Sequence, residues 1–287
     1  MRERDFARIH SITEGQLVAA EVGRSAIRIK TDIGAVLNGL TGVGEVMALT
    51  RNESAVHEKI GPYEKVSVNP HASIVLGKQI DLRIFPSRWV YGFAVEKKAD
   101  DGAIKHSLQF FDAAGNAVHK VHARPATDLV AWAALVETLR HDEQADTIAV
   151  KPYAKAAVEG APAAVSELRD AWAAMTDTHQ FFGLLKKLNF ERLNALETVG
   201  EDYAWKLDHT AVEGMFRAVA GTDLPVMAFV GNDGCIQIHS GPITNVSPMG
   251  PWLNVMDETF HLHLRLDHVT DAWAVRKPTK DGNVTSV

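Results

Sequence analysis

The sequence predicts an α+β protein made of two sequence-related repeats, each a mainly antiparallel β-sheet with flanking helices. Two observations predict this fold. Segments with alternating apolar and polar residues occur in blocks, and segments with helical periodicity lie between the blocks. The chain also matches itself when it is shifted by 180 positions, and its 287 residues suffice for about two domains. We therefore expect an N-terminal repeat at 1–155 and a C-terminal repeat at 156–287.

The internal repeat is long and needs no gaps. VMALTRNESAVHEKIGPYEKVS, which begins at Val46, aligns with VMAFVGNDGCIQIHSGPITNVS, which begins at Val226. Between positions 45 and 102, 15 of 58 residues are identical to the residue 180 positions later. So long a period indicates a duplicated domain rather than a solenoid. The hairpin and helix that follow position 102 have no counterpart before Val287, so we expect an unpaired sheet edge there.

The predicted elements of the first repeat begin with a helix at 31–40, where TDIGAVLNGL places an aspartate before an apolar helical pattern. Two segments, 72–85 and 88–97, alternate and are rich in β-branched and aromatic residues, which is typical of strands. SLQFFDAAGNAVHKVHA (107–123) predicts a hairpin with glycine in its turn. A second helical pattern follows at 128–141.

The second repeat follows a predicted linker, the alanine- and proline-bearing segment 151–165. Helical patterns recur at 163–175 and 210–221, and LPVMAFVGNDGCIQIHSGP (224–242) predicts two strands around a tight turn. Because strands and helices are grouped in this way, we expect mainly antiparallel sheets in both repeats.

Composition and charge exclude several classes of protein. A single cysteine, Cys235, excludes a disulfide framework, a zinc ribbon and a cysteine-ligated iron–sulfur cluster. A formal net charge of −6 argues against a dedicated nucleic-acid binder, which carries a basic face. The N-terminal MRERDFARIH lacks the apolar region of a secretory signal, and no apolar run approaches the ~20 residues that span a bilayer. We expect a cytoplasmic protein without membrane insertion.

One segment, MTDTHQFFGLLKKL (175–188), places a histidine at the start of a predicted helix. Asp177 suits the N-cap and Gln180 completes a capping box, so His179 is expected at the second helical position. The positive end of the helix dipole favours the neutral imidazole, which is the form that binds a metal. Four apolar residues at helical spacing predict the core face: Phe181, Leu184, Leu185 and Leu188.

The other face of this helix suits a flat ligand. Phe182 and Gly183 follow His179 by three and four residues, so an aromatic ring and a position without a side chain are expected beside the imidazole. Lys186 and Lys187 could meet carboxylates at the edge of such a ligand. Histidine ligation, an aromatic neighbour and a cationic rim suit haem. A histidine hydrogen-bonded to a backbone carbonyl is the other interpretation of the same pattern.

Several long segments resemble the HemS/ChuS/HmuS-type cytoplasmic haemin transport and haemin-degrading proteins. In chain order they are RNESAVHEKIG, IDLRIFPSRWVYGFAVE, SLQFFDAAGNAVHKVH, WAAMTDTHQFF, GNDGCIQIHSGP, MGPWLNVMD, FHLHLR and AWAVRKPT. Members of that family are built from two related halves and bind one haem. The resemblance implies that His179 is the proximal haem ligand and that Arg83 and Phe85 lie on the distal side. It implies further that Lys277 binds a haem propionate.

The ligand that the resemblance implies is haem b, and the implied role is to take up imported haem and to store or deliver it for iron acquisition. The implied partners are a haem importer on the donor side and a haem oxygenase or other acceptor. The family has also been assigned oxidative opening of the haem ring with release of iron, so the sequence leaves enzymatic activity open. It leaves the oligomeric state open as well.

A third interpretation rests on two other histidines. FHLHLRLDH places His261 and His263 two residues apart on a predicted strand, hence on one face. Together with His268 or His239 they would form a non-haem metal site. An ordinary sheet face that carries histidines gives the same pattern, so this alternative stays open at the level of sequence. No P-loop, Rossmann fingerprint or serine-nucleophile elbow is present.

Overall fold

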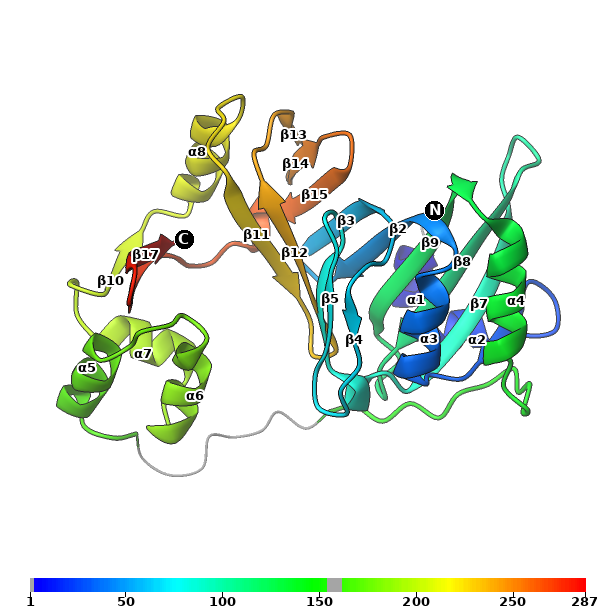
Figure 1. Cartoon of the computed structure of the whole chain (residues 1–287), viewed down its shortest axis with the longest axis horizontal. Coiled ribbons are helices and arrows are strands. Elements are labelled where there is room, and N and C mark those ends of the chain that lie inside the picture. The colour runs from blue at the N-terminus through cyan, green and yellow to red at the C-terminus, as the bar shows by residue number, and fades with distance from the viewer. Residues whose placement is uncertain (1–2, 154–161) are drawn as a thin grey trace. The chain divides into compact units, whose positions relative to one another are not determined.

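A computed structural model of the chain describes residues 3–153 and 162–287 (Figure 1). These residues form two compact units. The first unit comprises the described residues of Met1–Tyr153 together with Val219–Arg265. The second comprises the described residues of Ala154–Ala218 together with Leu266–Val287. No helix within the described ranges is long and apolar enough to cross a membrane.

The first unit is built on two antiparallel sheets. One has nine strands in the order β1-β7-β8-β9-β2-β3-β15-β14-β13, and the other has five in the order β11-β12-β6-β5-β4. The strands of the first repeat are β1 (Ala26–Ile29), β2 (Gly44–Arg51), β3 (Ala55–Gly61), β4 (Val66–Ser67), β5 (Ser73–Leu76), β6 (Asp81–Ile84), β7 (Tyr91–Lys98), β8 (Ile104–Phe111) and β9 (Ala117–Thr127). Those of the second repeat are β11 (Val226–Gly231), β12 (Cys235–Gly241), β13 (Val246–Met249), β14 (Trp252–Met256) and β15 (Phe260–Arg265).

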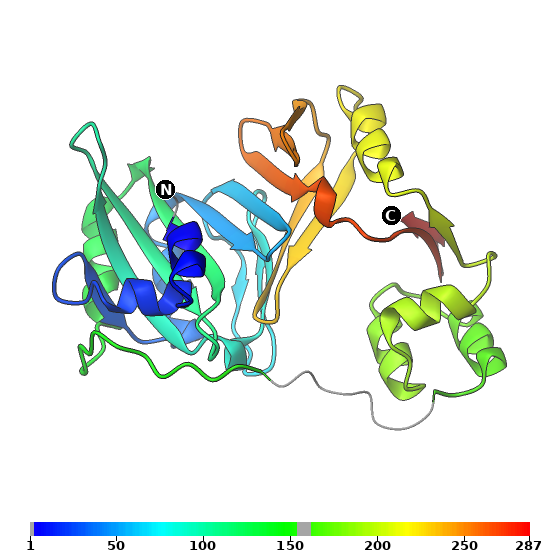
Figure 2. The same ribbon diagram turned by 180° about the vertical axis from the view of Figure 1, so that it is seen from behind.

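Helices cover both faces of the nine-stranded sheet, as the two opposite views show (Figures 1 and 2). The larger core lies under α3 (Ile33–Leu40) and α4 (Leu129–Leu139), which bury residues such as Leu37 and Trp132 against the strands. The other face packs Phe93 and Phe111 under α2 (Glu14–Ala19), which α1 (Glu3–Ile9) precedes. A short 3-10 helix, η1 (Pro86–Arg88), joins β6 to β7.

The second unit combines helices with a three-stranded antiparallel sheet in the order β10-β16-β17. Its elements are α5 (Val165–Ala173), α6 (Gln180–Lys187), α7 (Arg192–Thr198), β10 (Ala204–Leu207), most of α8 (Thr210–Val219), η2 (Leu266–His268), β16 (Ala272–Thr279) and β17 (Gly282–Ser286). Its core is formed around Trp172, Phe181, Leu185 and Val275.

The predicted fold class and the main predicted elements are confirmed. Helices occur at each of the helical patterns, and the side chains of Asp32 and Asp128 cap α3 and α4. The predicted hairpin is β8–β9, and β17 is an edge strand as expected. The sequence patterns did not point to α1, α2 or α7, which are short. Most of the predicted linker, 154–161, lies outside the described residues.

The duplication is visible element by element. β12 and η2 occupy the positions of β3 and η1 shifted by 180 residues. β1 pairs with β7 as β10 pairs with β16, and β4-β5-β6 form a meander as β13-β14-β15 do. In the first repeat β9 lies between β8 and β2, whereas the corresponding edges of β17 and β11 carry no strand among the described residues.

The two repeats exchange strands, and for this reason the compact units do not coincide with the repeats 1–155 and 156–287. β15 of the second repeat pairs with β3 of the first, and β6 of the first pairs with β12 of the second. The registers are equivalent, because Ala55 pairs with Leu264 and the residues 180 positions away, Cys235 and Ile84, also pair. The exchange therefore has pseudo-twofold symmetry and places β13–β15 in the first unit.

Equivalent residues of the two repeats make reciprocal contacts across this pseudo-twofold axis. The side-chain amide of Asn52 donates to the Gly231 carbonyl at 3.0 Å, and that of Asn232 donates to the Arg51 carbonyl at 2.9 Å. Lys59 Nζ lies 3.2 Å from Nδ1 of its counterpart His239. These contacts link the β2–β3 hairpin of the first repeat to the β11–β12 hairpin of the second.

We predict that Asn232→Ala destabilises the first unit more than the matched Asn52→Ala. The Asn232 side chain is half-buried, donates to Arg51 and Val118 and accepts from the two backbone N–H groups of Gly234 and Cys235. At roughly 1 kcal/mol per hydrogen bond, loss of these four bonds lowers the free energy of unfolding by about 4 kcal/mol. The Asn52 side chain donates to Gly231 and accepts from the backbone N–H groups of Ser54 and Ala55, and because it is more exposed, its loss costs at most about 3 kcal/mol. Urea denaturation of both variants measures the difference. Equal effects would contradict this account of the interface between the repeats.

Candidate haem-binding site

His179 lies in the turn between α5 and α6, and this turn is held by side-chain hydrogen bonds. The Gln180 side-chain oxygen accepts from the backbone N–H groups of Thr176 and Asp177 at 2.9 and 3.3 Å. Asp177 Oδ1 accepts from the backbone N–H of His179 at 2.8 Å. Half of the predicted capping box is therefore present: Gln180 accepts from the backbone N–H of Asp177, but the Asp177 carboxylate accepts from His179 and not from the backbone N–H of Gln180. The expected helical position of His179 is wrong by two residues, because a tight turn precedes α6 and the helix begins at Gln180.

The imidazole of His179 is oriented by Asp177. Nδ1 lies 2.6 Å from Asp177 Oδ1, and the His179 side chain is 87% exposed. The hydrogen bonds from the His179 backbone and side chain lower the pKa of Asp177, so the carboxylate can only accept. Nδ1 must therefore carry the proton. In the neutral imidazole the lone pair is then on Nε2, and the neutral imidazole is the form of histidine that binds metals.

The surface next to His179 is apolar and open, as the helical spacing predicts. Phe182 is 64% exposed, and a Cβ added at Gly183 would meet no atom within 4 Å. On the opposite face of α6, Phe181 and Leu185 are buried in the core of the second unit. A flat apolar ligand therefore has both surface and space on the side of α6 that carries His179.

Two cations contact the aromatic residues of α6. Lys277, on β16, places Nζ 4.8 Å from the centre of the Phe181 ring, and burial followed by the charge of Arg192 lowers its pKa. Arg192, on α7, lies 5.8 Å from the centre of the Phe182 ring. No sequence pattern predicted a role for Arg192, which contacts Phe182 because α7 packs beside α6. Both side chains are suited to the carboxylates of an anionic ligand.

The residues predicted for the distal side lie in the first unit. Arg83 is on β6, where it forms an ion pair with Asp81 and donates to the Leu82 carbonyl at 3.2 Å. Phe85 follows β6 and is partly buried. The structure thus places His179, Phe182, Gly183 and Lys277 in the second unit, where Lys277 contacts Phe181 on the core side of α6, and Arg83 and Phe85 in the first unit.

Several other histidines pack in the core of the first unit. His119 is buried, with Nδ1 2.8 Å from the Thr50 hydroxyl and Nε2 2.7 Å from the Tyr63 hydroxyl. His239 stacks on Phe260 with ring centres 3.9 Å apart. Burial lowers the pKa of His57 and of His119 to about 3, so both stay neutral at neutral pH.

The two histidines of the third interpretation do lie on one face of β15, but they bind different partners. His261 Nδ1 lies 2.9 Å from Glu58 and His263 Nδ1 lies 2.6 Å from the Asn254 side-chain oxygen. Across residues 3–153 and 162–287, no three His, Cys, Asp or Glu side chains gather where they could hold a metal ion. The geometry therefore lends no support to a non-haem metal site here.

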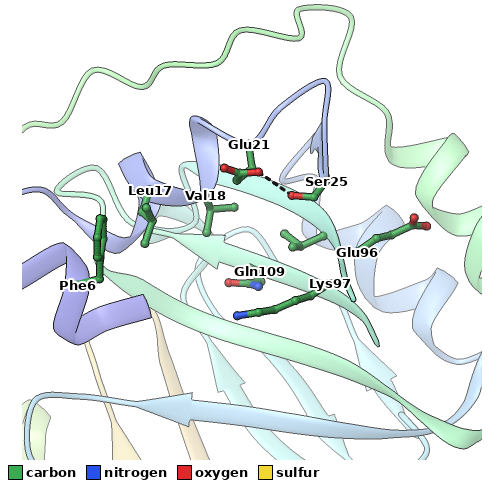
Figure 3. A pocket seen from close by; sticks show the side chains of 9 residues that line it. Phe6, Leu17, Val18, Glu21, Ser25, Glu96, Lys97 and Gln109 are labelled. Carbon is green, nitrogen blue, oxygen red and sulfur yellow. Dashed lines mark hydrogen bonds between the residues drawn. The ribbon is translucent and has the colours of Figure 1, made fainter. Parts of the chain in front are cut away.

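Two cavities of the first unit are lined by other residues. A cavity of about 350 Å³ lies between α1–α2 and β7–β8, where Phe6, Val18 and Val95 form apolar walls around Gln109 and Lys97 (Figure 3). Lys97 is the counterpart of Lys277 in the repeat, so this cavity corresponds to the Lys277 region of the second unit. A more polar cavity of about 440 Å³ lies beside Arg4, Asp112 and Asn232. Neither of these two cavities includes a residue predicted to contact haem.

Comparison with known proteins identifies the family. The sequence model described as "Haemin-degrading HemS.ChuX domain" matches residues 11–139 and 189–287. The chain belongs to the HemS/ChuX family. Arg83, Phe85 and Lys277 lie within the matched ranges, and His179 lies between them.

Relatives of this HemS/ChuX-family chain match nearly its whole length. The "Hemin transport protein HemS" of Yersinia enterocolitica is 41% identical over 286 residues, which are 99% of this chain and 82% of that protein. The structure of holo-PhuS, a "heme-binding protein" from Pseudomonas aeruginosa, matches at 43% identity with a TM-score of 0.95, over 99% of this chain and 83% of that one. The Escherichia coli "heme degrading enzyme" ChuS matches at 37% identity with a TM-score of 0.91, over 99% and 83%.

We predict that the first unit loses stability as the pH falls through the range from 6.5 to 3. The unfolded chain binds protons at His57 and His119 near pH 6.5 and the folded chain only near pH 3, so stability rises with pH across this window. At pH 4.5 each histidine costs on the order of 2 kcal/mol. Denaturant unfolding at pH 7 and 4.5 measures the loss. His119→Gln should reduce the dependence of the unfolding free energy on pH, whereas His71→Gln, at an exposed position, should leave it unchanged. The same pH dependence in both variants would refute the prediction.

Proposed function

We propose that this chain is a cytoplasmic haem-binding protein that takes up imported haem and stores or delivers it for iron acquisition. The observation that carries the proposal is the imidazole of His179. Its Nδ1 is held by Asp177 and its Nε2 is exposed to a ligand, in a chain that is 41% identical to a haemin transport protein. The proposed cargo is haem b, held by His179 as the proximal iron ligand.

The second unit supplies a chemically suitable surface for one side of a porphyrin. Phe182 offers an exposed ring and Gly183 leaves space beside it. Lys277 is proposed to pair with a propionate, and such a carboxylate partner would offset the burial that lowers its pKa. Arg192 adds a second cation at the same side of the site.

Arg83 and Phe85 are proposed to contact the distal side of the haem. Arginine stays charged and carries only donors, so Arg83 cannot ligate iron. It can donate hydrogen bonds on the distal side while the sixth position of the iron stays exchangeable. An exchangeable site suits a protein that must release its cargo. A haem importer as donor and a haem oxygenase as acceptor are the partners consistent with this role.

The alternative function is that of a haem-degrading enzyme. It is favoured by the likeness to ChuS, which is described as a heme degrading enzyme, and by the exchangeable distal side that Arg83 would provide. Both functions require the same bound haem, so they differ in what happens to it after binding.

We predict that His179→Ala weakens haemin binding about 100-fold or more, because even the loss of a group that only supports a metal ligand costs about 10–100-fold. Titration with haemin, followed by the Soret band, measures this. The matched control is His209→Ala, since His209 is also exposed, also precedes a helix and also follows an aspartate. The proposal fails if the His179 variant binds haemin like the wild type, or if both variants lose binding equally.

We predict that the haem complex delivers its haem intact. The complex is incubated with ascorbate and oxygen, with catalase present to remove peroxide that destroys haem non-enzymatically. Apomyoglobin serves as an acceptor whose spectrum reports transfer. Quantitative appearance of holomyoglobin supports the carrier function. Formation of a defined open-chain tetrapyrrole in the presence of catalase would contradict it and establish the enzymatic alternative.

A further inference from the structure

We propose that Asp177 is a positioning residue that fixes the tautomer and raises the donor strength of His179, and so favours binding of ferric over ferrous haem. This inference rests on the proposed function for its consequence at iron. The predicted tautomer of His179 is a property of the haem-free protein, so it can be measured without haem.

Asp177 binds both the backbone and the imidazole of His179. A single oxygen, Oδ1, accepts from the backbone N–H of His179 at 2.8 Å and faces Nδ1 of the same residue at 2.6 Å. Because both bonds end on one atom, they restrict the imidazole in position and in orientation. A distance of 2.6 Å lies at the short end for a charge-assisted N–H···O bond.

The turn that presents this carboxylate is itself fixed from both sides. Gln180 binds the backbone N–H groups of Thr176 and Asp177 through one side-chain oxygen and lies 3.3 Å from the Thr176 hydroxyl through its amide nitrogen. The backbone N–H of Lys280, between β16 and β17, donates to the Thr176 carbonyl at 3.0 Å. The carboxylate is therefore held by the sheet as well as by α6.

A second aspartate–histidine pair in the same chain, in which the two residues are adjacent, does not make this short contact. Asp208 and His209 also precede a helix. There Asp208 Oδ1 accepts from the backbone N–H and hydroxyl of Thr210 at 2.8 and 2.6 Å, and His209 Nδ1 stays 3.7 Å away. The short contact is thus made by Asp177 and His179 and not by Asp208 and His209.

A group that hydrogen-bonds to a metal-ligating histidine changes how strongly that histidine donates to the metal. A carboxylate that accepts from Nδ1–H fixes which nitrogen meets the metal and makes that nitrogen a stronger donor. A stronger and more anionic donor stabilises ferric iron more than ferrous iron, which lowers the reduction potential. Such a site would hold haem in its ferric form and resist reduction until a stronger electron donor, or an acceptor protein, is present.

The tautomer is tested on the haem-free protein by two-bond ¹H–¹⁵N correlation NMR of the histidine rings, with the His179 signals assigned by their loss in His179→Ala. We expect the Nδ1–H tautomer for His179 in the wild type and a gain of the Nε2–H tautomer in Asp177→Asn. Asp208→Asn should leave the His179 signals unchanged. A wild-type His179 that is mainly Nε2–H, or that does not respond to Asp177→Asn, would overturn the proposal.

The effect on iron is tested on the haem complex by affinity and redox titration. Asp177→Asn should weaken ferric haemin binding about tenfold and raise the midpoint potential, and Asp208→Asn should change neither. If His179→Ala abolishes binding while Asp177→Asn leaves affinity and potential as in the wild type, the role of Asp177 is refuted and the haem function stands. If His179→Ala binds haemin normally while the tautomer responds to Asp177→Asn, the assignment of His179 as the iron ligand is refuted and only the pairing of Asp177 with His179 remains.

Discussion

The pairing of β3 with β15, and of β12 with β6, is the constraint on which the first unit depends. Each repeat contributes a three-stranded meander to the sheet of the other, so neither of these sheets can form from one repeat alone. The contacts of Asn52 and Asn232 across the axis follow from this exchange, as does the approach of Lys59 to His239. The exchange also separates the second repeat into two parts. Its strands β11–β15 join the first unit, while α5–α7, β10, most of α8 and β16–β17 belong to the second.

The fold could be predicted from the sequence where local chemistry decides it. Alternation predicted the strands and helical periodicity predicted α3 and α4, and the structure shows that the side chains of Asp32 and Asp128 cap these two helices. The exchange could not be predicted, because the sequence of β15 is as suited to pairing with β12 as with β3. That choice depends on how the repeats pack. The internal repeat nevertheless predicts that the two meanders, β4–β6 and β13–β15, pair with equivalent strands.

The site could be predicted in part. Helical spacing alone placed Phe182 and Gly183 on the side of α6 that carries His179 and placed Phe181 in the core. The start of α6 was predicted two residues early, since the pattern does not distinguish a capped helix from a tight turn before it. Arg192 was missed because its proximity to Phe182 arises from packing between helices. Arg83, Phe85 and Lys277 came from resemblance, and their joint role stays a prediction.

The histidines of this chain show why one of them is suited to iron. In the core of the first unit, His119 and His239 have their ring nitrogens bound to neighbours. His179 instead combines exposure with a partner on the far nitrogen. The most direct test is resonance Raman spectroscopy of the ferrous haem complex made with ¹⁵N-labelled histidine. An iron–nitrogen stretching band that shifts to lower frequency on labelling, persists in His209→Ala and disappears in His179→Ala is the predicted result. A band that survives in His179→Ala, or that does not respond to the label, would contradict the assignment of His179 as the ligand.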